Sequence, residues 1–534
     1  MRLLLRPRCL FSSVPSWATV DPWTLSGSKP HTVHQILDGK SFKGSSSVAI
    51  PDPVNGEKFI NCSHPSNNAE LDAFVQSQKN VPQSGLHNPL KNVHRYQQYG
   101  EIFLKIATEM RKPEIQDFFV KLTQRVMPKS WMQVTGEVVV TRRFFENFAG
   151  DNPRFFQQAF NVAGDYDGQS SSGYRWPYGN VCLITPFNFP IEIPALQVFG
   201  ALLTGNRPLM KCDTRMSVVM EQFLLFSQAC GMPLEDVNFL NCSNEQMEYV
   251  LDHANFGVTQ FTGSSRVAEH LAKKLHGKVR IEDAGFDWKI LGPDVLNPDY
   301  VAWTADQDAY AATGQKCSAQ SILFAHENWV KAGIYDKLKA QAAKRKLEDL
   351  TCGPVITWDN KRIKEHMDKI LAIPGAKLLF GGKPLSNHTV PEFYGAWQPT
   401  AVEVPLAEFQ KNFDLCSQEL FGPFQVVVPY SDKDVNTIID CCNNFTHQLT
   451  AGVVSNDVLF LNKILGNTKN GVTYAGNRAR TTGAPQNHWF GPAGDPRGAG
   501  IGTKEAILTV WTTHREIVRD YGPIPENWKI PNPT

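Results

Sequence analysis

The stretch 314–319 (GQKCSA) contains a cysteine in the setting of a loop nucleophile. A helix is predicted to close at residues 310–312, and a strand is predicted at 321–324. Protein scaffolds place reactive groups on loops held between such rigid elements. Because the thiolate is the attacking species, Cys317 would need a base, a cation or a helix terminus nearby. A free cysteine is more often a small buried apolar residue, and the local sequence alone favours that simpler interpretation.

Three further stretches place polar groups at the ends of predicted strands. Asn188 lies in the turn 186–190 (PFNFP), Lys211 ends a strand, and Ser264 belongs to a turn, 262–265 (TGSS), that opens a helix. The free backbone donors of such a helix could hold a phosphate. Each residue also has a structural explanation, as a turn residue, a solvated strand end and an N-cap respectively.

These residues need a scaffold, and the hydrophobic pattern predicts its class. Helices are predicted at 93–110 and 115–126 and around 138–148, followed by a hairpin or an extended arm within 154–178. From residue 180 buried strands alternate with helices, which predicts a doubly wound parallel sheet that binds ligands at the carboxyl ends of its strands. A second α/β segment begins near Trp288. A final strand is predicted at 507–510, where it would pair with the edge of another subunit.

The composition excludes several classes of function. The 534 residues include 53 lysines and arginines against 52 acids, so no global field favours nucleic acid or an anionic membrane. Eleven cysteines without a Cys-x-x-Cys pair argue against a zinc site and against a disulfide framework, so no metal is expected. The most apolar region, 181–203, contains three prolines and cannot cross a bilayer as one clean helix.

The first twenty residues differ in kind from the rest. Arginine, leucine and serine dominate, and no acid precedes Asp21. This composition is typical of a mitochondrial or plastid transit peptide, and the alternative is a disordered tail with an accidental bias. We expect a transit peptide over residues 1–20 and a protein of the mitochondrial matrix.

Taken together, six motifs resemble the aldehyde dehydrogenase superfamily in order and approximate spacing. They are Asn188 in PFNFP, Lys211, 261–264 (FTGS), Glu282, Cys317 in GQKC, and 419–423 (ELFGP). The resemblance covers nearly everything from residue 30 onward. The stretch 281–289 (IEDAGFDWK) replaces the usual glutamate-leucine-glycine-glycine-lysine. With 482–484 (TGA) and Phe490 downstream, this variant looks like the plant-type pyrroline-5-carboxylate dehydrogenases.

The resemblance implies an α/β fold of two doubly wound domains with a β-arm for oligomerisation. Residues 21–154 and 177–287 would form the NAD-binding domain, and 288–502 the catalytic domain. Residues 155–176 and 503–534 would form the oligomerisation arm and tail. A homodimer or a higher homo-oligomer is expected, without a nucleic-acid partner.

The implied reaction is the NAD-dependent oxidation of glutamate γ-semialdehyde to glutamate. The implied catalytic residues are Cys317 as the nucleophile, Glu282 as the base and Asn188 as an oxyanion donor. The implied cofactor contacts are Phe187, Lys211, Gly263, Ser264, Glu419 and Phe421. The implied substrate contacts are Phe187, Ser318, Gly483, Ala484 and Phe490.

Two departures and two alternatives accompany this interpretation. Thr214 replaces a glutamate that many family members use to chelate the ribose hydroxyls, so NADP remains the less favoured alternative to NAD. Ala484, where related enzymes have serine, offers only its N–H to a substrate carboxylate. The chain could instead oxidise an aliphatic or betaine aldehyde. A hydrolase or a non-catalytic protein is the more remote alternative, and the hydrolase would need a histidine near Cys317, although the nearest in sequence is His326.

Overall fold

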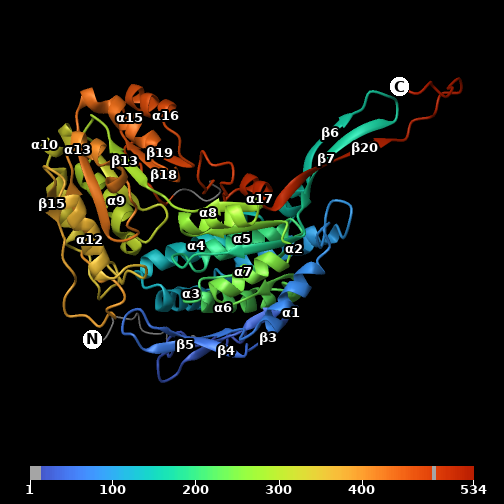
Figure 1. Ribbon diagram of the computed structural model, residues 1–534, viewed down its shortest axis with the longest axis horizontal. Helices are drawn as coiled ribbons and strands as arrows, with labels where there is room; N and C mark the ends of the chain where they lie inside the picture. Colours follow the sequence, from blue (N-terminus) through green and yellow to red (C-terminus); the bar gives the residue numbers. More distant parts are fainter. Residues whose placement is uncertain (1–13, 484–488) are drawn as a thin grey trace.

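Two seven-stranded sheets form two lobes that lie side by side (Figure 1). The computed structural model describes residues 14–483 and 489–534, so Ala484 and most of the expected transit peptide lie outside the described residues. Each sheet is covered by helices on both faces, which confirms the predicted pair of doubly wound α/β units. A small third sheet is made of β1 (His31–Val33), β5 (Lys58–His64) and β4 (Ser46–Pro51).

The first lobe is built on a largely parallel sheet with an antiparallel edge. Its strands, in spatial order, are β12 (Val279–Glu282), β11 (Val258–Thr262), β8 (Asn180–Ile184), β9 (Arg207–Lys211), β10 (Asn238–Phe239), β2 (Gln35–Leu37) and β3 (Lys40–Phe42). One face carries α2 (His94–Glu109), α3 (Pro113–Val126), α4 (Trp131–Asn147), α5 (Glu192–Leu203) and α6 (Ser217–Ala229). The other face carries α1 (Asn68–Lys79), α7 (Asn244–His253) and α8 (Ser265–Lys274).

Neighbouring residues of one strand are buried in different cores, on opposite faces of the sheet. This explains why helices cover both faces. Val181 and Leu183 of β8 pack into the core beneath α5, whereas Cys182 between them packs into the core beneath α7. Successive side chains of a strand point to opposite faces, so a strand covered on both faces is apolar throughout. The continuous apolar runs in the sequence after residue 180 reflect this double burial.

The second lobe repeats the arrangement. Its strands are β15 (Lys377–Phe380), β16 (Thr400–Glu403), β17 (Phe424–Tyr430), β14 (Gln320–His326), β13 (Asp287–Leu291), β18 (Thr450–Val454) and β19 (Val472–Ala475). One face carries α9 (Pro298–Tyr310), α10 (Glu327–Lys331) and α11 (Ile334–Ala342). The other carries α12 (Asn360–Leu371), α13 (Leu406–Lys411), α14 (Phe413–Cys416), α15 (Val435–Asn444) and α16 (Val458–Asn467).

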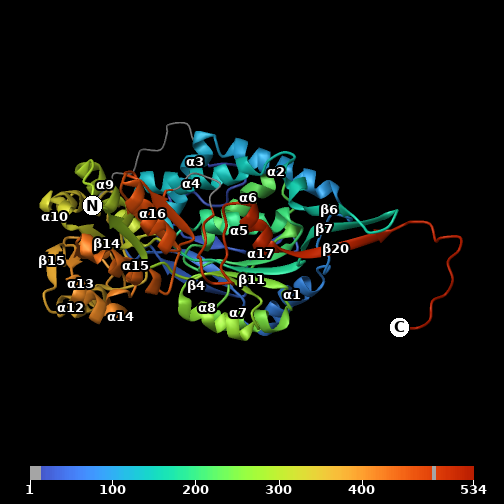
Figure 2. The ribbon, with the colours of Figure 1, turned by 90° about the horizontal axis from the view of Figure 1, so that it is seen from above.

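A three-stranded arm projects from the first lobe (Figures 1 and 2). The hairpin predicted within 154–178 is confirmed as β6 (Gln158–Ala163) and β7 (Gln169–Pro177), which are antiparallel. Strand β20 (Thr512–Asp520) pairs along the whole of β7. Residues 521–534 continue beyond the arm, away from both lobes (Figure 2).

The strand predicted at 507–510 is wrong, because these residues belong to helix α17 (Lys504–Trp511). The Thr503 side chain accepts a hydrogen bond from the Ala506 N–H and caps this helix. Ile507, Val510 and Trp511 are buried at helical spacing, and α17 packs against α5. A short apolar run fits both the helical and the strand period, so its sequence alone does not distinguish the two. Here the packing of these residues against α5 made the segment a helix.

The two lobes share buried surface. Leu347, Ile356 and Tyr394 of the second half of the chain belong to the main core of the first lobe. Residues 497–499, expected in the catalytic segment, lie along the edge strand β12 of the first sheet, where Ile281 exchanges backbone hydrogen bonds with them. Among the described residues, no helix is both long and apolar enough to cross a membrane.

Candidate active site

The polar residues predicted at strand ends lie along one edge of the first sheet. Because β8, β9, β11 and β12 run parallel, their carboxyl ends meet at this edge. Lys211 and Phe261 are both level with the last residue of β8, and Glu282 is level with Thr262. The turn that contains Asn188, the end of β9 and the start of α8 therefore lie on the same side of the sheet as Glu282.

The Cys317 loop leaves helix α9 through an unusual backbone turn. Ala312 and Thr313 have φ values of 54° and 57°, and Gly314 has a φ of 69°. The left-handed region costs a residue other than glycine roughly 1–2 kcal/mol. Three consecutive residues in this region turn the chain sharply, so that Cys317 follows the end of α9 closely and precedes β14.

Gln315 holds this loop against the second lobe. Its side chain is fully buried, its Nε2 donates to the Pro354 carbonyl at 2.9 Å, and its Oε1 accepts from the Ile356 N–H at 2.7 Å. Both ends of the amide are thus satisfied by one backbone segment. These bonds fix the position of Cys317 two residues later, which gives Gln315 a structural role in the loop.

Gly314 allows the loop to approach the segment 419–423 closely. A Cβ at this position would lie 2.0 Å from the Gly422 carbonyl oxygen, and the φ is positive as well.

Gly314→Ala would therefore push the two backbones apart, and we expect kcat/KM to fall about 10²-fold, as for a displacement of about 1 Å at a reacting group. Steady-state kinetics measures the effect. Gly466→Ala in α16, where a Cβ meets nothing within 4 Å, is the matched control and should leave kcat/KM unchanged; equal values for the two variants would contradict the prediction.

Cys317 is the accessible thiol of the site. Of the ten cysteines in the described part of the chain, nine are buried and Cys317 is partly exposed. Burial raises its pKa well above the usual value, and the negative charge of Glu282 raises it further. At neutral pH the residue therefore rests as a thiol, and it needs a base to become a nucleophile.

Glu282 has the environment of that base. It ends β12, is 2% exposed, and neither of its carboxylate oxygens has a hydrogen-bond partner among residues 14–483 and 489–534. Burial raises its pKa to about 7, a shift that the Cys317 thiol opposes and the Asp283 charge reinforces. A general base works best when its pKa lies near the working pH. A Cβ on Gly285 would lie 2.2 Å from the Cys317 carbonyl oxygen, so the segment after Glu282 runs against the nucleophile loop.

The turn that contains Asn188 is held by a buried ion pair. Lys129 and Glu137 have fully buried side chains, and Lys129 Nζ lies 2.8 Å from Glu137 Oε2. The other carboxylate oxygen of Glu137 accepts from the backbone N–H groups of Ile191 and Glu192, at 3.0 and 3.4 Å. Glu137 thus caps helix α5 from outside, and Asn188, which is 2% exposed, lies in the turn just before this helix.

Aromatic rings connect this turn to the second lobe. Phe187 meets Phe421 edge to face, with ring centroids 5.8 Å apart. The guanidinium of Arg215 lies 5.0 Å from the Phe187 ring on another side, and its Nη1 donates to the Ile356 carbonyl. The structure therefore brings Phe187 next to Phe421, and both remain predicted cofactor contacts.

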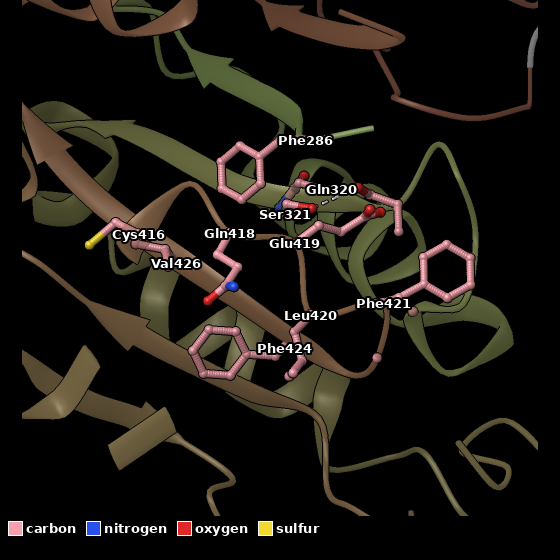
Figure 3. A pocket seen from close by; sticks show the side chains of 13 residues that line it. Phe286, Gln320, Ser321, Cys416, Gln418, Glu419, Leu420, Phe421, Phe424 and Val426 are labelled. Carbon is pink, nitrogen blue, oxygen red and sulfur yellow. Dashed lines mark hydrogen bonds between the residues drawn. The ribbon is translucent and has the colours of Figure 1, made fainter. Parts of the chain in front are cut away.

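The segment 418–423 lies opposite the nucleophile loop. Glu419 and Phe421 line a small pocket together with Gly314 and Ala319 (Figure 3). Figure 3 shows the Glu419 side chain directed toward the side on which Phe421 lies, away from Gln418. Burial raises the pKa of Glu419 well above its usual value, and the charges of Asp287 and Asp283 raise it further.

The strand ends that are predicted to bind the cofactor provide hydrogen-bond donors and one acidic side chain. Lys211 is 7% exposed, and its Nζ donates only weakly, to the Cys212 carbonyl at 3.4 Å. The Ser264 side chain is exposed and does not cap helix α8, so it remains free for a ligand. Asp213 is held by two side-chain bonds from Arg215, at 2.7 and 2.9 Å, and by the Arg215 N–H at 3.0 Å, and the Lys211 charge also lowers its pKa.

One predicted substrate contact, Ser318, is connected to a buried carboxylate through Thr481. The Thr481 hydroxyl donates to the Ser318 carbonyl at 2.8 Å, and the Thr481 N–H donates to Asp308 at 2.9 Å. Gly483 follows with a φ of 83°. Phe490 packs against the main core of the first lobe, whereas Ala484 lies outside the described residues.

The sequence interpretation missed the two residues that support this geometry, Glu137 and Asp308. Glu137 gives one local signal, because Val134, Val138 and Thr141 place it on the buried stripe of its helix. An acid on a buried stripe needs a partner. Asp308 gives none, because its partners come from distant parts of the chain.

Comparison with known proteins yields one family. The sequence profile described as "Aldehyde dehydrogenase family" matches residues 42–509. The mitochondrial delta-1-pyrroline-5-carboxylate dehydrogenase 12A1 of Arabidopsis thaliana is 53% identical over 98% of this chain and 94% of its own length. A probable aldehyde dehydrogenase of Linum usitatissimum is 54% identical over 98% of this chain and 95% of its own length.

Solved structures show the same fold at low sequence identity. Aldehyde dehydrogenase 21 from Physcomitrella patens, in complex with the reaction product succinate, superposes with a TM-score of 0.79 at 19% identity, covering 93% of this chain and 100% of its own. Betaine aldehyde dehydrogenase from Staphylococcus aureus, in complex with NAD+, has the same TM-score and identity, with 93% of this chain and 97% of its own covered. At this identity the likeness concerns the fold.

Proposed function

Because the chain belongs to the aldehyde dehydrogenase family, we propose that it oxidises glutamate γ-semialdehyde, the open form of pyrroline-5-carboxylate, to glutamate with NAD. The substrate assignment rests on the 53% identity to the Arabidopsis thaliana relative, whose name states this activity. The single structural observation that carries the chemistry is the partly exposed Cys317 thiol next to the buried, unpartnered carboxyl group of Glu282.

The residues support a two-stage reaction. Glu282 takes the thiol proton, and the Cys317 sulfur then forms a bond to the aldehyde carbon. The oxyanion of this adduct is held by the Asn188 amide and the Cys317 N–H, and such preorganised donors supply a large part of catalysis. Bound NAD supplies the hydride acceptor that turns the adduct into a thioester. Glu282 then gives the thiol proton to solvent, takes a proton from the water that cleaves the thioester, and returns it to the departing sulfur, which releases glutamate and restores the thiol.

The residues along the sheet edge fit a dinucleotide. We assign Lys211 to the adenosine ribose, Gly263 and Ser264 to the pyrophosphate, and Glu419 to the nicotinamide ribose with Phe421 and Phe187 beside it. The free Ser264 side chain at the start of α8 and the position of Glu419 beside Phe421 support these roles. We propose NAD over NADP from the family resemblance, because the Asp213 charge is already paired with Arg215.

The assay that tests this function uses the purified chain with pyrroline-5-carboxylate, betaine aldehyde and pentanal, each with NAD and with NADP. We expect the highest kcat/KM for pyrroline-5-carboxylate with NAD, and glutamate as the product by mass spectrometry. A higher value for betaine aldehyde or pentanal would overturn the substrate, and a higher value with NADP would overturn the cofactor. Cys317→Ser should form no product while it still binds NAD.

Ser318, Gly483 and Ala484 are proposed to hold the substrate carboxylate, with Phe187 and Phe490 beside the aliphatic chain. Ser318→Ala removes one hydrogen bond to a charged group, which is worth about 1.5–3 kcal/mol. We expect KM for glutamate γ-semialdehyde to rise at least about tenfold and KM for pentanal to stay the same. Steady-state kinetics with both aldehydes decides the point, and an equal rise would remove Ser318 from the carboxylate site.

Location and assembly extend the proposal. We propose that residues 1–20 direct the chain to the mitochondrial matrix, which agrees with the mitochondrial relative. We also propose the expected division into domains, namely residues 21–154 with 177–287 for the cofactor and 288–502 for catalysis. The arm of β6, β7 and β20 has a free β6 edge with exposed Val162, which supports a homodimer or a higher homo-oligomer.

A further inference from the structure

Glu192 is an acidic residue in the active site that the reaction scheme does not use. It is the first residue of α5, four positions after Asn188, and its side chain is partly exposed. In the described part of the chain, no hydrogen bond or ion pair is made by its carboxyl group. A carboxyl group in this situation is costly unless something compensates its charge.

The neighbours of Glu192 do not supply that compensation. Burial and the charges of Glu137 and Glu282 raise its pKa to about 8. Lys129 is the cation that opposes this rise, but its Nζ is already bound to Glu137. Glu137 is in turn fully occupied by Lys129 and by two backbone N–H groups. Among these acids, Glu192 is the one with an accessible carboxyl group and no partner.

Glu192 begins the helix that follows the Asn188 turn, and its backbone N–H donates to Glu137 Oε1 at 3.4 Å, which places it beside the candidate oxyanion donor. Its charge contributes to the raised pKa of the Cys317 thiol, and the charge of Glu282 contributes to its own. Glu282 itself is 2% exposed and unpartnered. The interior around Cys317 therefore holds acids that cannot all ionise together, and a cationic group placed beside Glu192 would favour its ionised form, which a neutral or anionic aldehyde would not do.

We propose that Glu192 binds the α-ammonium group of the substrate while the aldehyde carbon is attached to Cys317. This inference rests on the proposed function, since the ammonium group belongs to glutamate γ-semialdehyde. In that molecule four bonds, each about 1.5 Å long, join the aldehyde carbon to the ammonium nitrogen. The distance between these two atoms is therefore about the length of one long side chain. Glu192 and Ser318 then recognise the two charged groups of the same α-carbon, and an ammonium bound to a carboxylate forms a strong charge-assisted hydrogen bond.

Three aldehydes distinguish recognition of the ammonium group from recognition of the carboxylate. Glutamate γ-semialdehyde carries both groups, 4-aminobutanal lacks the carboxylate, and 5-oxopentanoate lacks the ammonium. The variant Glu192→Gln keeps the shape of the side chain and removes the charge. We expect KM to rise about 10- to 100-fold for the two ammonium-containing aldehydes, as for a lost hydrogen bond to a charged group. KM for 5-oxopentanoate should stay within about twofold, and kcat should change little for all three.

The controls distinguish this role from others. Glu192→Asp keeps the charge and should restore part of the affinity for 4-aminobutanal. Ser318→Ala should show the opposite pattern, with a raised KM for 5-oxopentanoate and an unchanged KM for 4-aminobutanal. An equal effect of Glu192→Gln on all three aldehydes, in KM or in kcat, would overturn the proposal in favour of proton transfer or of a structural role. A wild-type chain that does not prefer glutamate γ-semialdehyde over 5-oxopentanoate would overturn the proposed substrate and ammonium recognition together.

Discussion

Replacing Glu282 by glutamine is expected to lower kcat about 10²- to 10⁴-fold, the range that a positioned general base contributes. The glutamine has nearly the same shape but accepts no proton from the Cys317 thiol or from water. Neither carboxylate oxygen of Glu282 is bound to another described group, so the exchange should disturb few structural contacts. Steady-state kinetics at saturating substrate and NAD measures the loss.

The pH dependence tests the same role. Glu282 must be ionised to act as a base, and burial raises its pKa to about 7. Wild-type kcat/KM should therefore rise as the pH increases through about 7 and then level off. Alkylation of Cys317 by iodoacetamide, followed by mass spectrometry without any cofactor, should show the same rise. In Glu282→Gln this rise should disappear, and alkylation should accelerate only at more alkaline pH, where the buried thiol itself ionises.

Asp283→Asn provides the matched control for Glu282. The Asp283 charge raises the pKa of Glu282, so its removal should move the rising limb of the profile to lower pH and leave the plateau near that of the wild type. A Glu282→Gln variant that retains the wild-type plateau would transfer the role of base to another group. An unchanged alkylation profile in that variant would show that water activation, and not thiol activation, is the task of Glu282.

Asp308→Asn is expected to lower the free energy of unfolding by about 3–5 kcal/mol, the usual cost of breaking a buried ion pair from one side. Asp308 is fully buried and accepts from Lys289 Nζ at 2.7 Å, from Arg480 Nε at 2.7 Å and from the Thr481 N–H at 2.9 Å. Its loss leaves the fully buried Lys289 without its ion-pair partner. Urea unfolding followed by fluorescence measures the change.

Two variants check the mechanism of this loss. Asp308→Asn combined with Lys289→Met should recover part of the stability, because the orphaned buried cation is then removed as well. Asp368→Asn removes an exposed ion pair with Lys364 on α12 and should change the unfolding free energy by at most about 1 kcal/mol. If Asp308→Asn and Asp368→Asn had the same free energy of unfolding, the ion pairs of Asp308 would not be important for stability.

Asp308→Asn should also affect substrate binding. Thr481 connects Asp308 to the Ser318 carbonyl, so release of this connection loosens the proposed carboxylate contacts. We therefore expect a raised KM for glutamate γ-semialdehyde at a temperature where the variant is still folded.

Much of the site could be predicted from the sequence, because its residues follow elements with clear periods. Lys211 and Glu282 end buried apolar strands, and parallel strands bring such ends to one edge of a sheet. The apolar run at 507–510 was too short to distinguish a helix from a strand. Packing of Trp511 and its neighbours against α5 made it a helix, and the arm strand begins directly afterwards.

The sequence by itself determined the family of the fold and the order of the motifs, and it predicted Cys317 as the nucleophile, since these depend on residue types and local periods. Only the tertiary structure determined which residues hold each group of the candidate site in place and in which direction its pKa is shifted. The raised pKa of Glu282 comes from burial between segments that are distant in the chain. Glu137 holds the Asn188 turn from another helix, and Asp308 joins three separate segments. Such contacts are set by how the elements pack, and a local stretch of residues can show that an acid such as Glu137 is buried but not which residues it contacts.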